Sequence, residues 1–182
     1  EADEIAMGKA ADPQIVAEYG LYDDAALAAY VDGVGQKLAK LSHRPDLQFT
    51  FRILDSPVIN AFALPGGYVY VTRGILAHMN NEAELAIVLG HEIGHVTARH
   101  GASQQSKQAL FGAGLQLGAV LSPQVARYGA ALQEGLGLLF LKFSRDDENQ
   151  ADDLGVTYVL RAGYDAKEGA RFFEVLDRQS QE

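Results

Sequence analysis

The side chains with the clearest chemical potential lie in the run His91-Glu92-Ile93-Gly94-His95, which has the form His-Glu-x-x-His. The run lies inside the apolar segment Leu85 to Val96, which predicts a buried helix. Because an α-helix turns about 100° per residue, His91 and His95 fall about 40° apart on one face, one turn from each other. Two neutral imidazoles in that arrangement can bind one zinc ion, and Glu92 then lies beside the open coordination position. The motif therefore predicts a hydrolytic zinc site with Glu92 as the general base.

A catalytic zinc site needs a third protein ligand. His100 does not match the metzincin pattern, which places its third His ten positions after the first. If the motif helix continues, His100 lies about 180° from His91 and faces away from the metal. We therefore expect a capping or surface role for His100.

A carboxylate on a later helix is the better candidate for the third ligand. Glu148 and Asp152 are spaced i, i+4, so that both lie on one side of the helix that begins near Ser144. One carboxylate can bind zinc while the other accepts the free N–H of a ligating His. The alternative is a solvated acidic helix start that favours the helix dipole, and the spacing alone does not decide between the two.

The segments around these residues predict an α+β fold: a mainly helical single domain over residues 1–182 with a small, mostly antiparallel sheet of about three strands. Gly90 and Gly94 lie one turn apart in the motif helix, where each lowers helix stability by up to about 1 kcal/mol relative to Ala. We expect another backbone to approach closely there. The predicted strands are the alternating segment 47–53, residues 59–64, and residues 68–72 after the Pro65-Gly66-Gly67 turn. The predicted helices are the stripe 27–41 with the acidic caps Asp23 and Asp24, the motif helix capped by Asn81 with Glu84, 144–162 started by Ser144 with Asp147, and a last helix from Asp165 through Leu176.

Composition restricts the function classes. The chain has 182 residues, a formal net charge of -9 and no cysteine. An acidic chain without a basic cluster argues against nucleic-acid binding, and the lack of cysteine excludes thiolate zinc sites. The segment 104–143 is apolar and rich in Gly, and we interpret it as two helical stretches with a break at Ser122-Pro123. It is too polar and interrupted to predict a membrane span, although a membrane-embedded protease that uses residues 108–141 remains an alternative.

The start at Glu1 suggests trimmed or processed termini.

Three strings in order carry a family resemblance. They are Asn60-Ala61-Phe62-Ala63-Leu64-Pro65-Gly66-Gly67, His91-Glu92-Ile93-Gly94-His95-Val96, and Ser144-Arg145-Asp146-Asp147-Glu148-Asn149-Gln150-Ala151-Asp152. Together they resemble the HtpX/BepA/LoiP-like gluzincin family of zinc metallopeptidases, which also contains the CAAX prenyl endopeptidases. The resemblance extends from about Phe49 to Leu176. It implies a zincin-like domain with one Zn²⁺ per chain bound by His91, His95 and Glu148, with Glu92 as the base and Asp152 as a support behind a ligating His.

The resemblance also implies a zinc-dependent endopeptidase that acts on misfolded or misassembled envelope proteins. The expected location is the periplasm or the outer membrane, with a lipid anchor on the precursor. In many members a further residue, often a His beyond the Glu ligand, stabilises the oxyanion; this chain has no His after His100, so we leave that role unassigned. The alternative function is a non-enzymatic, chaperone-like or binding module with a structural or latent zinc site.

An extended substrate can pair its backbone with an exposed sheet edge. We expect the segment Ala61, Phe62, Ala63 and Leu64, just before the Pro-Gly-Gly turn, to be that edge. The alternative is an ordinary core hairpin in the same place.

Overall fold

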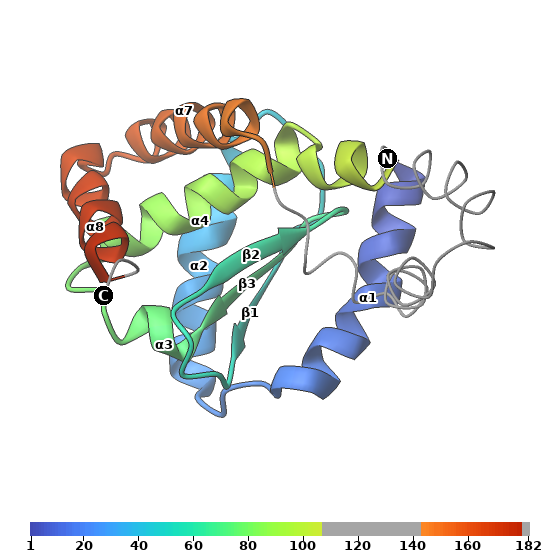
Figure 1. Ribbon diagram of the computed structural model, residues 1–182, viewed down its shortest axis with the longest axis horizontal. Helices are drawn as coiled ribbons and strands as arrows, with labels where there is room; N and C mark the ends of the chain where they lie inside the picture. The colour runs from blue at the N-terminus through green and yellow to red at the C-terminus, as the bar shows by residue number, and fades with distance from the viewer. Residues whose placement is uncertain (107–142, 180–182) are drawn as a thin grey trace, which may run out of the picture.

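The computed structural model describes residues 1–106 and 143–179 (Figure 1). This part is mostly helical with a small sheet, which confirms the α+β prediction; the predicted break at Ser122-Pro123 lies outside the described residues. The elements in chain order are α1 (Ala2–Tyr19), α2 (Ala25–Lys40), β1 (Thr50–Leu54), β2 (Ala61–Leu64), β3 (Tyr68–Thr72), α3 (Arg73–Leu76), α4 (Glu82–Thr97), α7 (Arg145–Arg161) and α8 (Ala166–Gln179).

The three strands form a mixed sheet in the order β1-β3-β2. Strand β3 pairs with β2 in antiparallel and with β1 in parallel orientation. Consecutive strands reverse direction, as expected, and Gly66 and Gly67 make the predicted turn with positive φ angles of 84° and 95°. The sheet is nevertheless not mostly antiparallel, because β3 lies between the other two strands. Four of the five β3 residues are buried, which suits the central position.

Helices cover both faces of the sheet. In Figure 1, α2 and α4 lie on one side of the strands and α1 lies on the other. Alternate residues of β3 follow this division: Val69 and Val71 belong to the main core with α2 and α4, whereas Tyr70 packs with Ile15 of α1 on the opposite face. Every face of the central strand is therefore buried.

Helix α1 is an element that the sequence patterns did not predict, and it contains Pro13. A buried polar contact fastens it to the sheet. Asp12 accepts hydrogen bonds from both the Arg52 guanidinium, at 2.8 Å, and the Tyr70 hydroxyl, at 2.7 Å. Burial, followed by the hydrogen bond to Asp12, raises the pKa of Tyr70 far above its ordinary value.

The two helices that carry the motif residues begin at the predicted caps. Asn81 accepts a hydrogen bond from the Glu84 amide, but the Glu84 carboxylate accepts from the Asn80 amide, one residue before the predicted partner. Ser144 and Asp147 form a complete capping box at the start of α7. Across residues 1–106 and 143–179, the helices are either too short or too polar to cross a membrane.

Candidate metal centre

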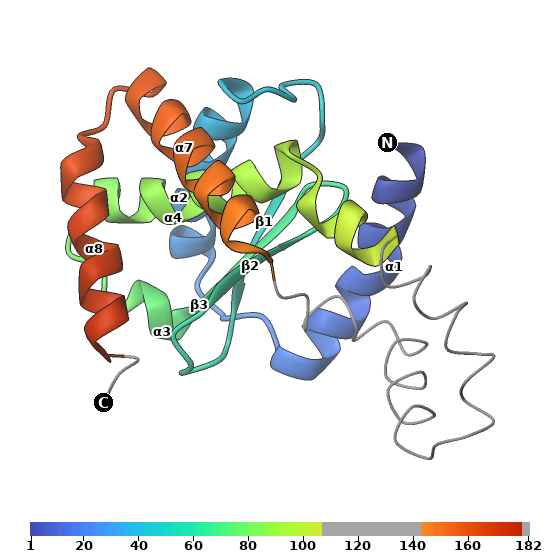
Figure 2. The same cartoon turned by 45° about the horizontal axis from the view of Figure 1, so that its top comes forward.

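Helices α4 and α7 pack at backbone contact, and Figure 2 shows α7 crossing in front of α4. A Cβ atom at Gly94 would lie 2.7 Å from the Ala151 carbonyl oxygen, and one at Gly90 would lie 3.0 Å from the Gly155 carbonyl oxygen. This confirms the close approach predicted from the two glycines. Gly155 makes the contact reciprocal, because a Cβ there would lie 2.8 Å from the His91 nitrogen. The small residues thus let α7 bring its side chains within reach of the motif.

The structure places His91, His95 and Glu148 in one cluster, as the resemblance implies. The two His Nε2 atoms are 3.0 Å apart, and the Glu148 carboxylate oxygens lie 3.4 Å from His91 Nε2 and 3.7 Å from His95 Nε2. One potential ligand atom from each side chain lies within 4.8 Å of the others. In a tetrahedral zinc site with bonds of about 2.0–2.2 Å, ligand atoms are about 3.3–3.6 Å apart. The observed separations scatter around that range, so these residues fit a zinc ion.

Asp152 lies beside His91, the ring that the resemblance leads us to expect it to support. Its Oδ1 atom lies 2.7 Å from His91 Nδ1, on the side of the ring opposite to the cluster. A neutral His91 that donates its Nδ1 proton to Asp152 keeps an unprotonated Nε2 for a metal. Burial lowers the pKa of His91, but hydrogen bonds with Asp152 and Glu148 outweigh it and raise the pKa to about 10. Hydrogen bonds from His91 and His95 hold the pKa of Glu148 well below its ordinary value. The carboxylates of Glu148 and Asp152 therefore stabilise positive charge at the cluster.

Glu92 lies in the same helix, with only 8% of its surface exposed. Burial raises the pKa of its carboxyl group, while the charges of His91 and His95 oppose this shift. A buried carboxylate beside a cation site is the arrangement that a general base requires, because a raised pKa favours proton uptake.

His100 does not have the predicted capping or surface role. It is 4% exposed, and its Nδ1 atom lies 3.0 Å from Nδ1 of His95. The prediction was wrong because α4 ends at Thr97 and does not continue through His100. Among the described residues, the group that could hold a metal ion consists of His91, His95 and Glu148 and does not include His100.

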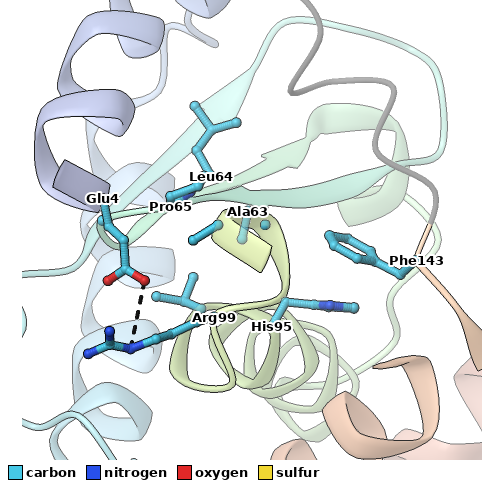
Figure 3. Close-up of a pocket in the computed structure, with 11 residues that line it drawn as sticks. Glu4, Ala63, Leu64, Pro65, His95, Arg99 and Phe143 are labelled. Atoms are coloured by element: carbon cyan, nitrogen blue, oxygen red, sulfur yellow. Dashed lines mark ion pairs between the residues drawn. The ribbon is translucent and has the colours of Figure 1, made fainter. Parts of the chain in front are cut away.

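A small pocket connects the cluster to strand β2. Figure 3 shows His95 and Phe143 on one side of it, Ala63 and Leu64 from β2 above, and the ion pair of Glu4 with Arg99 on the other side. The Phe143 ring stacks on the His95 ring with centroids 4.2 Å apart. Phe143 was not singled out in the sequence, because a single phenylalanine before a predicted helix carries no local signal of a contact with His95.

Strand β2 pairs only with β3 within the described part of the chain, so its other edge has no strand partner there. Two of the predicted edge residues, Ala63 and Leu64, line the pocket together with His95. Ala61 and Ala63 pack on the main core, whereas Phe62 packs with Tyr70 on the α1 side.

Comparisons with known proteins agree with this geometry. Residues 25–180 match peptidase family M48. The beta-barrel assembly-enhancing protease of Yersinia pestis is 34% identical over 97% of this chain, which covers 38% of that protein, and the Escherichia coli (strain K12) protein of the same name is 31% identical over 95% of this chain and 37% of its own length. The mitochondrial metalloendopeptidase OMA1 of Arabidopsis thaliana is 35% identical over 77% of this chain and 28% of its own length.

The chain thus spans well under half the length of these relatives. The family match nevertheless covers most of the chain, including all residues of the cluster. The chain therefore belongs to peptidase family M48, a family of metallopeptidases.

Proposed function

We propose that this chain is the catalytic domain of a zinc-dependent endopeptidase. The observation that carries the proposal is the pairing of a three-ligand cluster, His91, His95 and Glu148, with the buried carboxylate of Glu92 on the same helix. Three protein ligands leave one tetrahedral position for water or substrate, which is typical of catalytic and not of structural zinc.

Each residue of the site has a separate role in the hydrolysis of the peptide bond. When bound, zinc supplies a Lewis acid that polarises the scissile carbonyl and acidifies water. Glu92 accepts the proton of the attacking water and later donates it to the leaving amine. Asp152 holds the His91 ring with its Nε2 toward the cluster.

We place the substrate along the edge of β2 that has no strand partner among residues 1–106 and 143–179. Ala61, Phe62, Ala63 and Leu64 offer backbone donors and acceptors at the edge that does not face β3. The strand ends at the pocket that His95 and Phe143 line, so an extended peptide on β2 would pass the cluster. Backbone pairing accepts many sequences, which suits a peptidase that acts on proteins.

The relatives' names guide the biological role. Two relatives are named for enhancement of beta-barrel assembly, and the OMA1 relative is named as mitochondrial. We propose a role in protein quality control in the bacterial cell envelope, in the periplasm or at the outer membrane, with a lipid anchor on the precursor and misfolded or misassembled envelope proteins as substrates. Fractionation of cells that express the full-length protein tests the location.

The decisive test compares wild-type protein with Glu92→Gln. We expect both to bind one zinc per chain, because Glu92 is not a ligand, and the variant to hydrolyse casein about 10²- to 10⁴-fold more slowly, because only the base is lost. Glu168→Gln is the matched control, since Glu168 is exposed on α8. Casein cleavage by Glu92→Gln at the wild-type rate would refute the assigned base, and a zinc-loaded wild type without any peptidase activity would favour the chaperone-like alternative.

A further inference from the structure

The backbone turns sharply between the zinc motif and His100. Helix α4 ends at Thr97, and helical structure resumes over residues 100–106. Between them, Arg99 adopts a positive φ of 61°, the only such non-glycine residue in the described part of the chain. The left-handed conformation costs a non-glycine residue about 1–2 kcal/mol. The fold therefore holds this turn at an energetic cost, and the turn moves His100 from the far side of α4 to the side of His95.

The contact between His95 and His100 has a defined direction when His95 binds a metal. His95 Nε2 faces His91 and Glu148, so this atom must be unprotonated in a ligand. The proton of the neutral ring is then on Nδ1, which lies 3.0 Å from His100 Nδ1. His95 must be the donor of this bond, and His100 Nδ1 must be the acceptor.

The same reasoning fixes the second ring. A neutral His100 that accepts at Nδ1 has its proton on Nε2, and Nε2 lies 2.9 Å from the side-chain oxygen of Gln150. Asp147 is the nearest carboxylate to this atom, at 3.6 Å. The result is a directed chain from His95 through His100 to Gln150, in which each donor has an acceptor.

These hydrogen bonds support the His95 ring in the same way that Asp152 supports the His91 ring. Each ligating ring has a partner at its Nδ1 atom, and each partner depends on α7: Asp152 directly, and His100 through Gln150. Such supports commonly contribute 10- to 100-fold in metal affinity.

We propose that His100 is a positioning residue that, held by Gln150, keeps His95 in the Nδ1–H tautomer and its Nε2 directed at the metal. The inference rests on the proposed zinc-dependent function. The competing explanation is that His100 only fills space under the helix break, and the two explanations make opposite predictions for chosen variants.

The test uses two substitutions of His100 in the full-length protein. Phe keeps the ring volume but has no acceptor, whereas the Asn side-chain oxygen can take the place of Nδ1 but leaves space behind. We expect His100→Phe to weaken zinc binding at least 10-fold, measured by competition with a chelator, and His100→Asn to stay within about threefold of wild type. Equal affinities for His100→Phe and wild type, or a larger loss in His100→Asn than in His100→Phe, would overturn the proposal.

A variant on the surface avoids ambiguity from misfolding. Gln150 is exposed, so Gln150→Leu should fold; we expect it to weaken zinc binding about threefold or more, while Asn149→Leu, its exposed neighbour, does not. In the zinc-loaded protein, ¹H–¹⁵N spectra should show His100 protonated at Nε2 and free at Nδ1, and the reverse tautomer would contradict the proposal. A wild-type protein that binds no zinc would instead refute the proposed function itself, whereas zinc binding that ignores His100 and Gln150 would refute only the positioning role.

Discussion

Substitution of Gly94 by Ala should push helices α4 and α7 apart and weaken zinc binding, although alanine is the better helix former. A Cβ atom at Gly94 would lie 2.7 Å from the carbonyl oxygen and 3.1 Å from the Cα atom of Ala151. Both atoms belong to the backbone of α7, so no side-chain rotation can relieve the overlap. The helix as a whole must move by about 0.5 Å to restore ordinary contact distances.

Two opposing terms set the magnitude. Overpacking of this kind costs about 1–3 kcal/mol, whereas replacing a helical Gly by Ala gains up to about 1 kcal/mol. Gly33 isolates the second term, because it lies in α2, is exposed, and would place its Cβ with nothing within 4 Å. We therefore expect Gly33→Ala to raise the free energy of unfolding. The free energy of unfolding of the Gly94→Ala variant should be about 1–3 kcal/mol lower than that of the Gly33→Ala variant.

The displacement also reaches the metal centre. Glu148 lies three residues before Ala151 on the same helix, so a shift of α7 carries its carboxylate away from His91 and His95. Functional sites tolerate displacements of only about 0.5 Å, and we expect zinc affinity to fall about 10-fold. Denaturant unfolding of the metal-free variants and chelator competition measure the two effects. If Gly94→Ala matched Gly33→Ala in stability and bound zinc like wild type, the helix contact would not control the ligand spacing.

Three further predictions concern single contacts. Glu148→Gln should weaken zinc binding at least 10-fold without unfolding the protein, because Glu148 is 47% exposed; unchanged zinc stoichiometry after dialysis would contradict its role as a ligand. Hydrogen bonds from Tyr164 and Tyr30 lower the pKa of Glu82, so its carboxylate stabilises the fold above the unfolded pKa of about 4.5, and this contribution disappears as the pH falls through the lower, folded value. Glu82→Gln should accordingly lower stability at pH 7 by less than about 1 kcal/mol, since solvent screens the site, and a difference from wild type that persisted in acid would refute this origin. Arg99→Gly should be about 1 kcal/mol more stable than Arg99→Ala in thermal unfolding, because only glycine adopts the positive φ without strain, and equal stabilities would show that the turn stores no strain.

Local signals in the sequence predicted much of the site. The His-Glu-x-x-His spacing places two of the proposed ligands and the proposed base on one helix, and Ser144 with Asp147 marks where the second helix begins. Glu148 follows within the first turn of that helix, so its placement needs little tertiary information once the two helices pack. Gly90 and Gly94 predicted the packing of the two helices, because glycine in a helix interior indicates the close approach of another backbone.

The remaining features depend on contacts between distant segments. The central position of β3 reflects burial on both faces of the sheet, which neighbouring residues do not encode. The contact of Phe143 with His95 joins side chains 48 positions apart in the sequence, so no local pattern predicts it. The position of His100 depends on one dihedral angle at Arg99, a residue type that rarely adopts it.

Helix α7 carries three side chains that act on the proposed metal site in different ways. In the proposed site, Glu148 is the third ligand, Asp152 supports His91, and Gln150 supports His95 through His100. The backbone contact with α4 at Gly94 therefore sets all three distances at once, whereas each side chain sets only one. Substitutions on the outer surfaces of these two helices should therefore leave the proposed zinc site intact, provided that the contact itself keeps its small residues.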